Sequence, residues 1–457
     1  MKAPADTATW LSRIVGDSVS RARGGLPAWR RQQQGAAAHE LRRKGLPGRK
    51  QEAWRYTSLD FLERNRFVSA EDLPFDALVP EDIEEFLLPG DATQLLVFVN
   101  GRYAPDLSNP PSHPAGVHVS SLRQMLETDG KSLSAVLGST MAEHVDAFSA
   151  MNLALFTDGC YLRVDPGVHP ERPLEILHLA VWQETPVMFH PRNLILIGEG
   201  ARATLVERYA SLGRAASFTN TVTEIRLEEG AGLTHERLHE EAPTAHHLSR
   251  ISVHQNGDSR YQVTTAAVGP AWSRTDLHVE LAGREAEADL GGVYLAGDGQ
   301  LADVHTDLRH AVPGCTSRED FKGILDGKGR AVFDGRILVA RDAQHSDAQM
   351  KNDNLLLSRK AEVDTKPQLE IFADDVRCSH GTTVGQLDEN MLFYLRSRGI
   401  DEARARQLLC LGFAGGILER FRVPGVRERV NARIAGRLGE YPAPDASPAA
   451  ESAGGTP

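Results

Sequence analysis

Short β-strand patterns follow one another from about residue 160 to residue 385, and this run constrains the fold more than any other feature. Each pattern is rich in Val, Ile, Leu and Thr and ends at turn residues such as Gly198, Gly230 and Gly283. The turns fall roughly 15 residues apart, or about twice that, and no helical pattern separates the strands. Quasi-repetition over this length predicts a mainly β solenoid. A large β-sandwich is the alternative, and composition alone leaves it open.

Helical patterns flank the strand-rich region on both sides. The first 88 residues carry periodic apolar positions among charged ones, and after Gly385 the side chains of Asp388 and Asp401 stand where helix N-caps are expected. The last residues are rich in Ala, Pro, Ser and Gly, which is typical of disorder. We therefore divide the chain into a mainly helical N-terminal domain (1–150), a β-helix core (151–385), a C-terminal helical domain (386–439) and a disordered tail (440–457).

Composition excludes several classes of protein. The chain of 457 residues has 41% hydrophobic and 25% charged residues, and it contains no apolar run long enough for a membrane helix. Its first ten residues lack the apolar centre of a signal peptide. The net charge of −11 argues against general nucleic-acid binding. We expect a cytoplasmic protein that binds neither membrane nor nucleic acid.

The Cys-x-His pair at Cys378 and His380 is the first candidate for metal binding. On an extended strand, whose side chains alternate between two faces, both would lie on the same face, and we expect Gly381 to end that strand. The remaining cysteines, at 160, 315 and 410, form no Cys-x-x-Cys motif. Taken alone, the pair is a weak signal, and it is more typical of a buried cysteine beside a hydrogen-bonded histidine.

A literal zinc-peptidase motif, His-Glu-x-x-His, spans His235 to His239. That chemistry needs a helix, whereas the surrounding pattern predicts a strand, on which residues four apart lie about 13 Å from each other. We interpret the motif as a chance match on a solvated strand. No phosphate-binding loop occurs, so we expect the chain to bind no nucleotide. The polar positions between 344 and 354, which include Asn352 and Asn354, are interpreted as ladders along the coil corners.

The stretch around Cys378 nevertheless resembles a known family. Its Cys-Ser-His-Gly sequence is accompanied by Arg-Lys-Gln-Glu-Ala-Trp-Arg-Tyr-Thr at 49–57, by Gln349 with 352–358, and by Phe-Tyr-Leu-Arg-Ser-Arg-Gly-Ile at 393–400. These pieces resemble, in order, the SUF-system iron–sulfur cluster assembly proteins of the SufB/SufD family. The resemblance spans roughly residues 40 to 425, and the Cys-Ser-His-Gly form is of the SufD type rather than the SufB type.

The resemblance implies a right-handed parallel β-helix between two helical domains, and a scaffold rather than an enzyme. It implies a heterodimer with SufB through the β-helix, and docking of the SufC ATPase through the C-terminal helical domain. His380 would face a SufB cysteine and help hold a transient iron–sulfur cluster shared between the subunits.

The ligand count agrees with a shared site. An iron–sulfur cluster takes about four thiolate or imidazole ligands, and Cys378 and His380 supply at most two. Cys378 could be a ligand, a sulfur acceptor or a packing residue. The alternatives are a self-contained homodimeric scaffold, with His380 of two copies facing each other, a zinc peptidase using His235 and His239, and a β-helix carbohydrate-active enzyme.

Overall fold

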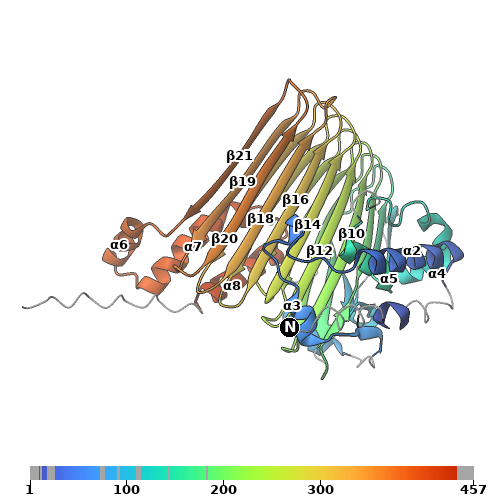
Figure 1. Ribbon diagram of the computed structural model, residues 1–457, viewed down its shortest axis with the longest axis horizontal. Coiled ribbons are helices and arrows are strands. Elements are labelled where there is room, and N and C mark those ends of the chain that lie inside the picture. Colours follow the sequence, from blue (N-terminus) through green and yellow to red (C-terminus); the bar gives the residue numbers. More distant parts are fainter. Residues whose placement is uncertain are drawn as a thin grey trace, which may run out of the picture.

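In the computed structural model the chain forms a parallel β-solenoid of two long sheets, with helices from both ends of the sequence packed around it (Figure 1). The mainly β prediction is confirmed, and a solenoid rather than a sandwich is present. No helix among the residues described is long and apolar enough to cross a membrane. The structure describes residues 10, 13–17, 26–72, 78–89, 93–109, 115–141, 145–181 and 184–439.

Two sheets, here called A and B, enclose a space between them that we call the lumen. Sheet A contains β1 (Val68–Ser69), β4 (Val117–Ser121), β5 (Cys160–Val164), β7 (Val187–Phe189), β8 (Arg192–Ile197), β10 (Ser217–Leu227), β12 (His246–Gln255), β14 (Trp272–Leu281), β16 (Leu301–His310), β18 (Arg330–Val339) and β20 (Glu362–Ile371).

Sheet B contains β2 (Gln94–Val99), β3 (Arg102–Tyr103), β6 (Leu174–Val181), β9 (Arg202–Leu212), β11 (Gly232–Glu240), β13 (Arg260–Ala267), β15 (Glu287–Ala296), β17 (Thr316–Leu325), β19 (Asp347–Leu356) and β21 (Arg377–Gly385).

From β8 onward the chain alternates between the sheets, and each strand pairs in parallel with the strand one full coil later. One ladder of sheet A runs through Phe218, His246, Trp272, Leu301, Arg330 and Glu362, at steps of 26 to 32 residues. The turns stack as well. Gly200 and Gly230 have φ values of 63° and 66°, a backbone conformation that suits glycine, and they lie one above the other.

Side chains alternate between the lumen and the outer faces, as the strand periodicity predicts. The lumen holds a continuous apolar core that includes Leu205, Ile225, Leu277 and Phe333, each at most 4% exposed. The outer faces of the two sheets carry separate apolar clusters, which the helices cover.

Ile83 and Phe86 pack against strands of sheet B, whereas other N-terminal segments pack against the outer face of sheet A. Phe61, for example, contacts Phe218 and Trp272 with ring centroids 5.4 and 4.8 Å apart. The helical elements of this part are α2 (Ala28–Lys44), η1 (Glu52–Trp54), α3 (Asp60–Asn65), η2 (Ala70–Asp72), η3 (Pro80–Phe86), η4 (Pro105–Leu107), α4 (Leu122–Leu133) and α5 (Ala147–Leu155).

The region before residue 151 is not only helical, because β2 and β4 join the two sheets. The domain limits at 150 and 385 stay a prediction. The predicted tail, 440–457, and most of the first 25 residues lie outside the described part of the chain.

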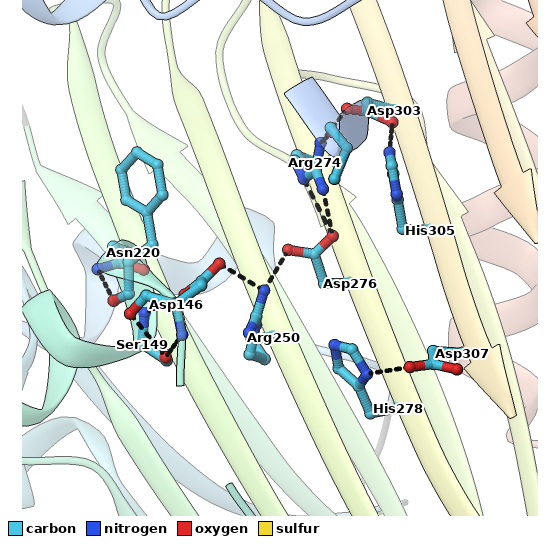
Figure 2. A network of polar contacts seen from close by, with 12 residues as sticks. Asp146, Ser149, Asn220, Arg250, Arg274, Asp276, His278, Asp303, His305 and Asp307 are labelled. Atoms are coloured by element: carbon cyan, nitrogen blue, oxygen red, sulfur yellow. Dashed lines mark hydrogen bonds and ion pairs between the residues drawn. The ribbon is translucent and has the colours of Figure 1, made fainter. Parts of the chain in front are cut away.

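Residues 49–57, one of the segments on which the family resemblance rests, include an anchor on sheet A. The guanidinium of Arg274 lies 4.0 Å from the ring centre of Trp54 and donates to the carbonyl of Ala53 at 2.7 Å. Thr57 Oγ1 donates to Asp303 Oδ2 at 2.6 Å. Figure 2 shows how Arg274 and Asp303 belong to a polar network across β12, β14 and β16, on which this segment rests.

The C-terminal helices are α6 (Glu389–Ser397), α7 (Glu402–Leu418) and α8 (Pro424–Gly439), and α6 and α7 begin at the predicted caps Asp388 and Asp401. Helices α7 and α8 bury apolar side chains on the outer face of sheet B. Figure 1 shows α6 standing apart, beyond the last strands of the solenoid.

Candidate functional site

The solenoid ends at β20 in sheet A and β21 in sheet B, and we call this the open end. Within the described residues, β20 pairs only with β18 and β21 only with β19, so each has one edge without a partner strand. Unpaired strand edges readily accept another strand. The middle strands of both sheets, by contrast, are paired on both edges.

The Cys-x-His pair lies on β21, which is extended from Arg377 to Gly385. In register, Cys378 lies beside Ala348 and His380 beside Met350, and both neighbours are buried members of the lumen core. Because parallel partners in register point to the same side, Cys378 and His380 form the last inward-facing row of the solenoid. His380 is nevertheless exposed, because no further coil of the described residues covers it.

Gly381 does not end the strand, contrary to expectation. It pairs with Lys351 in the middle of β21, and the ladder continues for four more residues. A glycine in a strand interior weakens the strand but keeps its backbone hydrogen bonds, and here the paired β19 holds it in place.

Cys378 differs from the other three cysteines because it is partly exposed, whereas Cys160, Cys315 and Cys410 are buried. Burial raises the pKa of the Cys378 thiol above its ordinary value, although the backbone of Ala348 opposes that shift. Among the described residues, no further His, Cys, Asp or Glu joins Cys378 and His380 in a metal-sized group. This chain therefore offers two potential cluster ligands at the open end, which is an incomplete set.

Exposed apolar side chains are concentrated in the same part of the sequence. Of the eight large hydrophobic side chains that are exposed among the described residues, six lie between residues 371 and 394. Phe372 at 60% and Val384 at 52% stand at the open end, and Phe393 on α6 is 73% exposed. Exposed apolar side chains concentrated in one segment indicate a contact surface.

Comparison with known proteins agrees with this architecture. The family model for the SufBD core domain of SUF-system FeS cluster assembly matches residues 180–413, and the model for the SufBD protein N-terminal region matches residues 26–176.

The chain belongs to the SufBD family. It is 36% identical over 401 residues to the iron–sulfur cluster assembly protein SufD of Escherichia coli, which covers 87% of this chain and 91% of that protein. A SufBD family protein of Synechocystis is 32% identical over 400 residues, covering 86% and 87% of the two chains. One from Mycobacterium tuberculosis is 34% identical over 256 residues, covering 52% and 64%.

In this SufBD chain the His-Glu-x-x-His motif lies on β11, so the predicted strand is confirmed, but its predicted solvation is wrong. His235, Glu236 and His239 are all 0% exposed. Glu236 points outward and accepts hydrogen bonds from the backbone N–H groups of Arg422 and Val423, just before α8. The charged flanks suggested solvent, whereas the C-terminal helices cover one face of the strand and the lumen encloses the other.

A buried polar cluster around Glu207 was not foreseen from the sequence. Its carboxylate accepts from His235 Nε2 at 2.8 Å and lies 3.4 Å from Arg237 Nη2. It also accepts from the hydroxyls of Tyr209 and Thr223. Burial alone would raise the pKa of Glu207, but the charge of Arg237 and the hydrogen bond from His235 outweigh it and hold that pKa well below its usual value.

The sequence did contain a sign of this cluster, because charged or polar residues occupy alternate positions of an apolar strand at 235, 237 and 239. Alternation shows that such residues share a face, yet it does not show that this face is the enclosed one.

The assignment of Asn352 and Asn354 to coil corners is also wrong. Both lie in the lumen at 0% and 2% exposure. Asn352 donates to the hydroxyl of Tyr294 at 3.0 Å, and Asn354 Nδ2 donates to Asn352 Oδ1 at 2.7 Å. A buried amide is stable in the lumen because neighbouring coils supply its hydrogen-bond partners.

Proposed function

We propose that this chain is a SufD-type scaffold subunit of a cytoplasmic SUF iron–sulfur assembly complex, in which it pairs with SufB and docks the SufC ATPase. In this proposal the open end of the solenoid meets SufB, and His380 contributes a ligand to a nascent cluster held between the two subunits. The incomplete ligand row on β21, at the unpaired end of the solenoid, carries the proposal.

Three features of the open end support pairing with another β-solenoid subunit. The edges of β20 and β21 are free in the described chain, the inward row ends in exposed His380, and Phe372 and Val384 of the last coil are exposed. A second subunit would cover all three, and it would supply the ligands that a cluster needs beyond Cys378 and His380. A scaffold must also release what it builds, and a ligand set split between two chains can open when the chains move apart.

Helix α6 supports the second contact, with the ATPase. Only Leu392 of this helix is buried, while Met391, Phe393 and Tyr394 are 52%, 73% and 54% exposed. An amphipathic helix whose apolar residues face solvent fits a groove on a partner protein. The adjacent α7 and α8 are committed to sheet B, so a pull on α6 would be transmitted to the solenoid.

The test of the ligand role is His380→Ala in a complex co-expressed with SufB and SufC. We expect an intact complex with less than a fifth of the wild-type iron and sulfide, because removing an exposed side chain alters little else. Ser379→Ala is the matched control, since Ser379 is the preceding exposed residue and points to the opposite face of β21. Wild-type cluster content in the His380→Ala complex would refute the role of His380.

Cys378→Ala distinguishes a role of this thiol in cluster assembly from a packing role. A ligand or sulfur acceptor predicts a loss of cluster similar to that of His380→Ala, whereas a packing residue predicts nearly normal content. Both measurements use the same complex, purified without oxygen, with iron, acid-labile sulfide and visible absorption as readouts.

The test of ATPase docking is Phe393→Asp on α6. We expect SufC to be lost from the purified complex while SufB is retained, because a charge at the centre of an apolar contact is costly. Glu389→Ala on the same helix is the control. Loss of SufB with SufC retained would show that the two surfaces have been assigned the wrong way round.

A homodimeric scaffold would use the same open end, and the same variants examine it. If the chain alone forms a stable dimer that holds a cluster, and if His380→Ala abolishes that cluster, SufB is not required and the homodimer is the correct assembly. Sedimentation of the chain with and without SufB distinguishes the two.

A further inference from the structure

Three side chains with metal-binding atoms meet inside the solenoid, far from the open end. His239 is the last inward-facing residue of β11, Glu241 follows the end of that strand, and His247 is the second residue of β12. One potential ligand atom from each lies within 4.8 Å of the other two. The turn at 241–245 brings the two strand ends together, so the His239–Glu241–His247 triad joins sheet B to sheet A.

Each member of the triad carries a buried polar atom for which the described residues supply no hydrogen-bond partner. These atoms are both ring nitrogens of His239, Nε2 of His247 and Oε2 of Glu241. The three residues are at most 2% exposed. A buried polar group without a hydrogen-bond partner is destabilising, so several at one point indicate a missing common partner.

Charge favours a cation as that partner. Within the described part of the chain, the only ion-pair partner of the buried Glu241 carboxylate within 4 Å is His247, at 2.7 Å from Nδ1 to Oε1. The neighbouring cation Arg237 pairs with Glu207 instead. A buried carboxylate needs a compensating positive charge, which a metal ion would supply.

The two imidazoles lie side by side. The ring centre of His239 lies 4.2 Å from that of His247, and Tyr209 packs against both rings and closes one side of the site.

We infer that His239, Glu241 and His247 bind a divalent first-row transition metal ion of the Zn²⁺ or Fe²⁺ class. Two imidazoles and a carboxylate suit these ions, whereas Ca²⁺ and Mg²⁺ take oxygen ligands. Glu241 can accept the Nδ1 proton of His247 through one oxygen and face the ion with the other, an arrangement that orients imidazole ligands. The ion would clamp the turn between β11 and β12.

This site is distinct from the proposed cluster site. Five ladder steps separate β11 from β21, which corresponds to about 24 Å at the usual strand spacing. Because the triad is enclosed, the ion would be incorporated as the coils assemble, and it would exchange slowly afterwards.

The test measures metal bound to the full-length chain after expression with added zinc or, in a separate arm, after refolding with Fe²⁺ without oxygen. We expect about one ion per chain in at least one arm, retained through brief chelation in the native state. His239→Asn and Glu241→Gln should reduce the bound metal at least tenfold. Glu241→Gln keeps the side-chain shape, so it remains informative if His239→Asn does not fold.

Two controls locate the ion. His246 precedes His247, but its imidazole points to the outer face and stacks on Phe61, with ring centres 4.3 Å apart. The variant His246→Gln should therefore leave the metal content unchanged. His380→Ala should also leave it unchanged. Refolding with Co²⁺ should give visible d–d absorption in the wild-type chain and none in Glu241→Gln.

The inference is overturned if the wild-type chain binds less than a tenth of an ion in both arms. It is equally overturned if the triad variants retain the metal, or if His380→Ala removes it.

Discussion

The middle of the solenoid and its open end carry the same kind of residue on the same inward rows, with opposite surroundings. In the row of sheet B that contains His235, the later positions are Val263, Leu290, Glu319, Met350 and finally His380. His235 is 0% exposed and is hydrogen-bonded to Glu207 and Tyr261, whereas His380 is exposed at the last coil.

The difference shows that a polar inward row has no fixed role in a solenoid. Where coils cover it on both sides, its partners come from the same chain and the residue contributes to stability. At the last described coil the same position lacks a covering strand, which leaves it open to a partner molecule. Substitutions should therefore act through stability in the middle and through assembly at the end.

Removing the Glu207 carboxylate should cause the largest loss of stability. Glu207→Ala leaves Arg237 buried without its carboxylate, and breaking a buried pair on one side costs about 3–5 kcal/mol. Urea unfolding of the isolated chain measures the change. The double variant Glu207→Gln/Arg237→Met should recover most of it, and a loss below about 1 kcal/mol in the single variant would contradict the assigned role.

Glu319 lies between the two regions. Its ionisation should lower the free energy of unfolding by roughly a few kcal/mol as the pH rises. Burial raises the pKa of Glu319 to about 8 from 4.5, with Asp307 adding to the shift and Thr306 opposing it. The stability contribution of the neutral carboxyl is fully present below pH 4.5 and is lost as the pH rises from 4.5 through 8, because over this range the unfolded state gives up the proton that the folded state keeps.

Glu319→Gln, which is neutral at every pH, should therefore melt close to the wild type near about pH 5 and clearly above it near about pH 9. Melting curves at matched ionic strength measure the difference. A difference that stays constant between these pH values would show that Glu319 titrates normally.

A charge at the open end should affect assembly and leave the fold alone. Val384→Lys changes a side chain that is 52% exposed, so we expect the stability of the chain to stay within about 0.5 kcal/mol and the affinity for SufB to fall at least tenfold. Val79→Lys, at 50% exposure and remote from the open end in sequence, is the matched control. Equal effects of both substitutions on SufB binding would remove the distinction between the regions.

The smallest change in stability is expected for His380→Ala, within about 0.5 kcal/mol. His235→Ala, in the same row, should cost about 1–3 kcal/mol because it leaves Glu207 and Tyr261 without a buried partner. Thermal unfolding of the two variants in parallel compares the same residue type in the two surroundings. Similar losses in both would mean that His380 is packed as His235 is.

Much of the architecture follows from local pattern. The alternation of apolar residues and the spaced turns predicted the solenoid strands, and Asp388 and Asp401 marked the starts of α6 and α7. The pairing of Cys378 with His380 on one face of a strand also follows from period two. Gly381 shows the limit of such rules, because a neighbouring strand held the backbone extended through a residue that commonly interrupts it.

The sequence by itself determined which residues form strands, which side chains share a face, and to which family the chain is similar. Only the tertiary structure decided which face is enclosed, that His239 meets His247 rather than His235, and that His380 stands uncovered at the last coil. The physical reason is that contacts between parallel coils join residues about 30 positions apart, whose pairing depends on the stacking of whole turns and leaves no mark in the local sequence.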